Sequence, residues 1–147
     1  MLYLPAIRIG FAQEVYTFIE PGFTRVFSDV TLIKENRTSE QTFLVAVTVS
    51  NPASALRAAT LDGGGNSSAD YRLTSPGNLI TLLFPPTRQS IALSFFLISD
   101  DLPEGTEAFQ ASSTPVEDTP NFQPPITNTA FQNTEIRIID DERELTI

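Results

Sequence analysis

The chain has 147 residues, of which 41% are hydrophobic and 18% charged, and this composition favours one folded domain over a disordered chain. Its formal net charge of −9 argues against nucleic acid and anionic membrane surfaces as partners, because both are bound through basic patches. The absence of His and Cys excludes disulfides, thiolate metal sites and catalysis through Ser–His or Cys–His pairs.

Short runs rich in Val, Ile, Thr and Phe, separated by clusters of Gly, Pro, Asn and Ser, indicate strands rather than helices. In chain order we predict strands at 7–19, 24–33, 42–49, 68–73, 79–84, 90–98, 108–112 and 131–139. Alternate residues are apolar in two of these runs: Phe43, Val45, Val47 and Val49 in the third, and Ile91, Leu93, Phe95 and Leu97 in the sixth. Such alternation is typical of half-buried antiparallel sheets.

Seven or eight strands at this spacing predict an all-β fold, a two-sheet antiparallel sandwich. We expect a single domain over residues 1–147, with its core at about 7–142. Pro85 and Pro86 separate two strands, and the Pro-rich segment 113–128 predicts a loop between the last two. The phenylalanines expected in the core are Phe11, Phe18, Phe84, Phe95, Phe96 and Phe109.

Two of the predicted strands end in acidic phrases. Residues 98–107 read Ile-Ser-Asp-Asp-Leu-Pro-Glu-Gly-Thr-Glu, and residues 138–142 read Ile-Ile-Asp-Asp-Glu. Carboxylates packed this closely repel one another, and we expect basic residues only beside the second phrase, at Arg137 and Arg143. Without His or Cys, oxygen is the remaining ligand for a metal, and oxygen sites suit Ca²⁺, Mg²⁺ or Mn²⁺.

The first phrase offers several oxygens from one loop. Glu104 and Glu107 flank a predicted Gly105-Thr106 turn, and two aspartates lie just before it. Ca²⁺ takes about six to eight oxygens at flexible distances, so this loop would supply three or four of them. The strand that ends at Asp140 would supply the rest if it lies alongside.

Further motifs carry a resemblance to a known family. Glu20 ends the first strand, Asp62 and Gly63 form a turn, and the sequence Ala69-Asp70-Tyr71 precedes a Pro-centred hairpin. Together with the phrases Asp-Asp-x-x-Glu-x-x-Glu-x-Phe and Ile-Ile-Asp-Asp-Glu, this order resembles the Calx-β domain of sodium–calcium exchangers and of large adhesion and matrix proteins. The wording of residues 102–109, Leu-Pro-Glu-Gly-Thr-Glu-Ala-Phe, is most similar to the adhesion and matrix branch, including Calx-β modules of sponge proteins such as aggregation factors.

The resemblance implies an immunoglobulin-like sandwich with Ca²⁺ bound at one end. Ser99 and Glu142 stand where calcium-rich members of the family have aspartates, and Ser99 is the weaker ligand. The positions that the resemblance makes ligands, Leu102 through its backbone carbonyl, are Glu20, Asp62, Asp100, Asp101, Leu102, Glu104, Glu107, Asp140, Asp141 and Glu142.

The function that follows is a non-enzymatic, calcium-binding Calx-β module of an extracellular adhesion or matrix glycoprotein. Glycosylation sequons at Asn36 and Asn66 favour a secreted or cell-surface location. The expected partners are neighbouring Calx-β or other extracellular domains, further copies in a homo-oligomer, or a matrix glycoprotein. The longest apolar stretches are only as long as strands, so we expect no membrane insertion.

Three other readings stay open at this point. A structural or oligomer-forming spacer without functional metal would use the same fold. An intracellular Ca²⁺ sensor, like those of exchangers, would use the same site and would carry no glycans. Glu104 and Glu107 are also reminiscent of a glycosidase pair, but the chain has no Trp to bind a sugar, and Tyr16 and Tyr71 lie in predicted strands.

Overall fold

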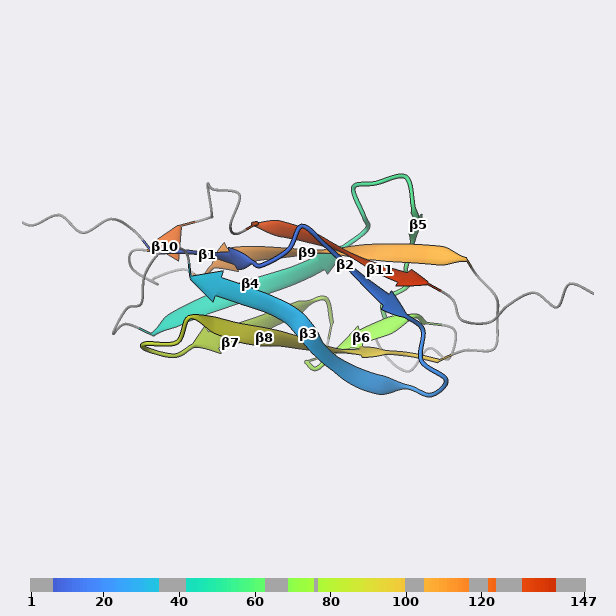
Figure 1. The fold of residues 1–147 in the computed structure, drawn as a ribbon, viewed down its shortest axis with the longest axis horizontal. Coiled ribbons are helices and arrows are strands. Elements are labelled where there is room, and N and C mark those ends of the chain that lie inside the picture. Colours follow the sequence, from blue (N-terminus) through green and yellow to red (C-terminus); the bar gives the residue numbers. More distant parts are fainter. Residues whose placement is uncertain are drawn as a thin grey trace, which may run out of the picture.

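The computed structural model describes residues 7–34, 42–62, 69–75, 77–99, 105–116, 122–123 and 131–139. Within these ranges the chain forms eleven strands and no helix, and the strands pack as two sheets (Figure 1). The described residues contain no helix long and apolar enough to cross a bilayer. The all-β, two-sheet sandwich predicted from strand spacing is therefore confirmed.

The first sheet has the order β10-β1-β3-β8-β6. Its strands are β10 (Phe122–Gln123), β1 (Ile7–Phe11), β3 (Arg25–Lys34), β8 (Ser90–Leu97) and β6 (Tyr71–Leu73). The second sheet has the order β2-β11-β9-β4-β7, with β5 beside β9. Its strands are β2 (Val15–Ile19), β11 (Asn133–Ile139), β9 (Thr106–Pro115), β4 (Phe43–Ser50), β7 (Leu79–Phe84) and β5 (Arg57–Ala58). Pairing is antiparallel except between β1 and β10, β2 and β11, and β5 and β9.

The predicted single strand 7–19 is wrong, because β1 and β2 belong to different sheets. Their inward residues explain the break. Ile9 and Phe11 are buried at odd positions, whereas Tyr16 and Phe18 are buried at even positions. Side chains alternate strictly along a strand, so one continuous strand cannot turn both pairs toward the core.

The other predicted strands are found within a few residues of their expected bounds, and that at 79–84 matches β7 fully. β9 runs on to Pro115 and β10 lies at Phe122–Gln123, so the predicted loop 113–128 is wrong for these residues. The rest of that segment is described only at Val116. β5 and β10 have two residues each, too few for a recognisable pattern.

The core lies between the sheets and is rich in aromatic side chains. All predicted core phenylalanines are buried except Phe96, which is half-buried under the guanidinium of Arg72, 4.5 Å from its ring centre. Phe109 of β9 stacks on Tyr71 of β6, with ring centres 3.7 Å apart and planes 5° apart. The same ring meets Phe95 of β8 edge-on at 5.7 Å. Phe109 thus joins the two sheets.

Candidate metal centre

Three strands of the second sheet bring their ends together at one end of the sandwich. β2 and β11 both finish there, and β9 begins there (Figure 1). Ile139, the last residue of β11, pairs with Ile19 on one side and with Thr106 on the other. The Glu20 backbone N–H donates to the Ile139 carbonyl at 2.8 Å. Glu20 and Glu107 therefore lie at the end where the second acidic phrase leaves β11.

The segment carrying Asp62 reaches the same end. The Asp62 backbone N–H donates to the Tyr71 carbonyl at 2.8 Å, and Tyr71 pairs with Leu97, the last residue of β8. The Ala59 N–H donates to the Ala108 carbonyl at 2.7 Å, which ties this segment to the start of β9. In chain order the first acidic phrase follows β8, which belongs to the first sheet, and precedes most of β9, which belongs to the second.

The three described candidate ligands are all buried. Exposed fractions are 5% for Glu20, 8% for Asp62 and 5% for Glu107. Burying a carboxylate is costly unless a positive charge or hydrogen bonds compensate for the lost water. Arg57 of β5 lies 3.9 Å from Glu107, although its own side chain is 63% exposed. The expectation that no basic residue lies beside the first phrase is therefore wrong, because β5 brings Arg57 there from a distant part of the chain.

Asp70 is a buried carboxylate at this end that the sequence did not single out as a ligand. It is 4% exposed, and its Oδ2 accepts a hydrogen bond from the Thr60 N–H at 2.7 Å. Its backbone carbonyl accepts from the Ile98 N–H at 3.0 Å. Burial, together with the charge of Asp70, raises the pKa of the Tyr71 hydroxyl. Asp70 thus ties Thr60 to the residue that precedes β6, and so helps to position the segment that carries Asp62.

The remaining predicted positions lie outside the described residues. These are Asp100, Asp101, Leu102, Glu104, Asp140, Asp141, Glu142, Asn36 and Asn66. Among the described residues alone, no group of three or more acidic side chains lies close enough to hold a metal ion. The described carboxylates are therefore one part of the predicted ligand set.

The residues on either side of the first acidic phrase have defined positions. The Ser99 N–H donates to the hydroxyl oxygen of Thr24 at 3.0 Å. Gly105 has a φ of +74°, in the left-handed region that favours glycine. Thr106 is already in β9, so the predicted Gly105-Thr106 turn is wrong for Thr106.

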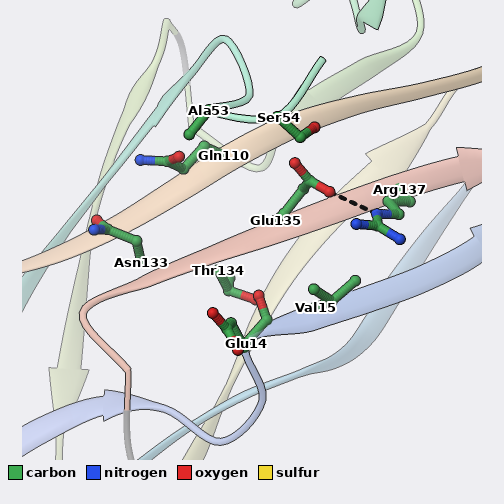
Figure 2. Close-up of a pocket in the computed structure, with 9 residues that line it drawn as sticks. All are labelled: Glu14, Val15, Ala53, Ser54, Gln110, Asn133, Thr134, Glu135 and Arg137. Atoms are coloured by element: carbon green, nitrogen blue, oxygen red, sulfur yellow. Dashed lines mark hydrogen bonds and ion pairs between the residues drawn. The ribbon is translucent and has the colours of Figure 1, made fainter. Parts of the chain in front are cut away.

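A separate hollow of about 410 Å³ lies over β9, β11 and the start of β2. Figure 2 shows Glu135 at its centre, with its carboxylate bonded to the Nε of Arg137 and the Ser54 side chain on the opposite side. Hydrogen bonding by Ser54, aided by Arg137, lowers the pKa of Glu135. Glu20, Asp62 and Glu107 do not line this hollow. Arg137 and Ser54 already compensate for the charge of the Glu135 carboxylate, so this hollow does not require a metal ion.

No protein-family model and no curated protein matches the chain. Solved structures do match. The apo form of the Calx CBD1 domain is similar with a TM-score of 0.61 and 19% identity, over 92% of this chain and 98% of that one. The Calx CBD2 domain has a TM-score of 0.58 and 12% identity, over 91% and 86% of the two chains. The calcium binding domain CBD12 of CALX1.1 has a TM-score of 0.59 and 18% identity, over 92% of this chain and 46% of that one. The chain therefore has the fold of Calx-β domains.

Proposed function

We propose that this chain is a non-enzymatic, Ca²⁺-binding module of Calx-β fold that belongs to an extracellular adhesion or matrix glycoprotein. The observation that carries the proposal is the burial of Glu20, Asp62 and Glu107 at one end of the sandwich. Both acidic phrases are attached to strands that end or begin there. Carboxylates that come to the same end of a fold repel one another, and a bound cation would offset this repulsion. An oxygen-only ligand set favours Ca²⁺ among the common metal ions.

The donor set fits calcium better than its competitors. Carboxylates on several separate segments give the flexible, oxygen-rich surroundings that Ca²⁺ accepts, whereas Mg²⁺ demands tight octahedral geometry and keeps its waters. Glu20, Asp62 and Glu107 are the described residues of the proposed ligand set. They do not by themselves lie close enough together to hold an ion, so oxygens from the two acidic phrases would have to complete the site. Bound Ca²⁺ would neutralise these carboxylates, and Asp70 would keep the segment that carries Asp62 in place.

One similar structure is itself described as a calcium binding domain, which supports the same role here. The extracellular adhesion role rests on the sequence: on the wording of residues 102–109, similar to sponge Calx-β modules, and on the sequons at Asn36 and Asn66. Mass spectrometry of protein from its native source should find glycan at Asn36 before Asn66. Two bare asparagines would favour the intracellular sensor instead.

Calcium binding is tested by thermal unfolding with and without Ca²⁺. Extracellular Ca²⁺ modules have Kd values of about 10⁻⁴ to 10⁻³ M. At about ten times Kd, binding to the folded state alone adds about 1.4 kcal/mol of stability, which corresponds to a rise of roughly 4 °C in Tm for this chain length. Mg²⁺ should give a smaller rise.

The matched variants are Glu20→Gln and Glu14→Gln. Both glutamates flank β2, but Glu20 is buried at the proposed site and Glu14 is exposed at the other end of the strand. Glu20→Gln should remove most of the calcium-induced shift, and Glu14→Gln should retain it. Glu104→Gln and Asp140→Asn should behave as Glu20→Gln does.

A structural spacer without functional metal is the second candidate, and Arg57 is the observation that favours it. Its guanidinium already offsets part of the charge of Glu107. Unchanged melting in millimolar Ca²⁺, with no heat of binding in calorimetry, would establish this candidate and reject the calcium site.

A further inference from the structure

Among the described residues, β7 pairs with β4 on one side, and no described strand pairs with its other edge. The edge strands of the two described sheets are β10, β6, β2 and β7, and with six residues β7 is the longest. An exposed strand edge presents a row of unpaired backbone N–H and C=O groups to other chains. Proteins commonly protect such edges with charged side chains or prolines, and β7, with the sequence Leu-Ile-Thr-Leu-Leu-Phe, contains neither.

The direction of the β7 backbone groups follows from one hydrogen bond. The Val49 N–H of β4 donates to the Asn78 carbonyl at 2.9 Å, so the groups of Asn78 face β4. Backbone groups alternate between the two sides of an antiparallel strand. The N–H and C=O groups of Leu79, Thr81 and Leu83 therefore point toward the free edge.

The same stretch is apolar and without charge on its outer face. Leu79 is 49% exposed, Leu83 57%, and Leu44 on the neighbouring β4 38%. No charged residue occurs in residues 41–56 or 73–87, the stretches that contain β4 and β7, although the chain has 18 acidic and 9 basic residues. Two copies that each carry a net charge of −9 repel least where this uncharged face lies.

We infer that a second copy of this chain adds its own β7 antiparallel to β7, with Thr81 on the two-fold axis. In this register Thr81 faces Thr81 of the copy. Leu79 of each copy faces Leu83 of the other, which gives three residue pairs in all. All three pairs use the outward-pointing backbone groups and form about six hydrogen bonds. The Leu79 carbonyl already accepts from the Ser75 hydroxyl at 3.0 Å, and its second lone pair remains for the new bond.

The edge at β2 does not serve the same purpose. β2 is flanked by Glu14 and Glu20, and antiparallel pairing of two copies around Thr17 would set Glu14 of one against Glu20 of the other. Like charges directly opposite each other destabilise strand pairing. Self-association is therefore expected at the edge of β7 and not at that of β2. It does not require bound Ca²⁺.

Pairing of one short strand buries less than the area of about 1,200 Å² at which stable complexes begin, so the dimer should be weak and depend on concentration. Sedimentation equilibrium of the full 147-residue chain in EGTA, up to about 1 mM, tests this, because even weak complexes are populated there. The average mass should rise from 16.1 kDa toward twice that value. A mass that stays at the monomer value throughout overturns the inference.

Substitutions at the proposed axis test the register. Thr81→Lys places two like charges face to face and should keep the chain monomeric, as should Thr81→Glu. An equimolar mixture of the two variants should recover the dimer. Thr17→Lys is the matched control, because Thr17 is the exposed central residue of the other long edge strand, and it should leave the dimer unchanged.

Amide hydrogen exchange separates strand pairing from packing of the apolar faces. Exchange at Leu79, Thr81 and Leu83 should slow as the protein concentration rises, while exchange at Ile80 and Leu82, which bond to β4, should not change. Dimerisation of Thr81→Lys alone, no recovery in the mixture, or exchange independent of concentration would each overturn the proposed pairing. Calcium-induced melting shifts are measured on monomeric Thr81→Lys, so the two proposals fail separately.

Discussion

Replacing Phe109 by alanine should remove the main contact between the sheets. The ring is 1% exposed, stacks on Tyr71 and meets Phe95 edge-on, and both partners belong to the opposite sheet. Buried Phe→Ala substitutions cost about 3–5 kcal/mol, which includes the lost contacts and the cavity left behind. With an unfolding entropy of about 2.1 cal/mol/K per residue, each kcal/mol lowers Tm by about 3 °C here, so we expect a fall of roughly 12 °C.

Urea and thermal unfolding, followed by circular dichroism, measure this loss. Phe23→Ala is the control, since Phe23 is 66% exposed and its removal should change stability by less than about 0.5 kcal/mol. Phe109→Leu should fall between the two, because it keeps most of the buried volume. A loss below about 1 kcal/mol for Phe109→Ala would refute the view that this ring joins the sheets.

Three further predictions concern single residues. Burial lowers the pKa of Lys34, so the unfolded chain binds the Lys34 proton more tightly than the folded chain does. The urea midpoint of unfolding should therefore rise as pH increases from the lowered pKa toward 10.5, and Lys34→Met should flatten that rise. Hydrogen bonding by Ser54 lowers the pKa of Glu135, so the stability that ionised Glu135 contributes is fully present above pH 4.5 and is lost as pH falls through the lowered pKa. Glu135→Gln should therefore lose less stability than the original chain on acidification, and an equal loss in urea unfolding would contradict this. Gly105→Ala should lower the free energy of unfolding by about 1 kcal/mol. The cause is the φ of +74° alone, because an added Cβ would meet no atom within 4 Å. Gly22→Ala, which also meets no atom but has no positive φ, should leave the melting temperature unchanged.

Local patterns in the sequence predicted much of the fold. Alternation placed Phe43, Val45, Val47 and Val49 on one face, and all four are buried. The break between β1 and β2 was missed although a signal was present. The buried positions change from odd to even between Phe11 and Tyr16, and attention to that phase would have divided the run.

Other features depend on contacts between distant segments and carry no local signal. Arg57 lies beside Glu107 only because the two-residue β5 pairs with β9, fifty residues further along the chain. Asp70 likewise acquires its role from a hydrogen bond to Thr60. The acidic phrases themselves are evident from the sequence. The pairing of β11 with β2 and β9 explains why the ends of β2 and β11 lie beside the start of β9 although these strands are far apart in sequence.

The parallel ladder between β2 and β11 has a mechanical consequence. Five residue pairs, from Val15 and Glu135 to Ile19 and Ile139, join the two strands. Tension applied through β1 and through the end of β11 pulls these strands in opposite directions along their length. The hydrogen bonds between β2 and β11 are then loaded in shear. They must break at the same time and not one after another. This geometry should make the fold resist unfolding when it is pulled along this direction.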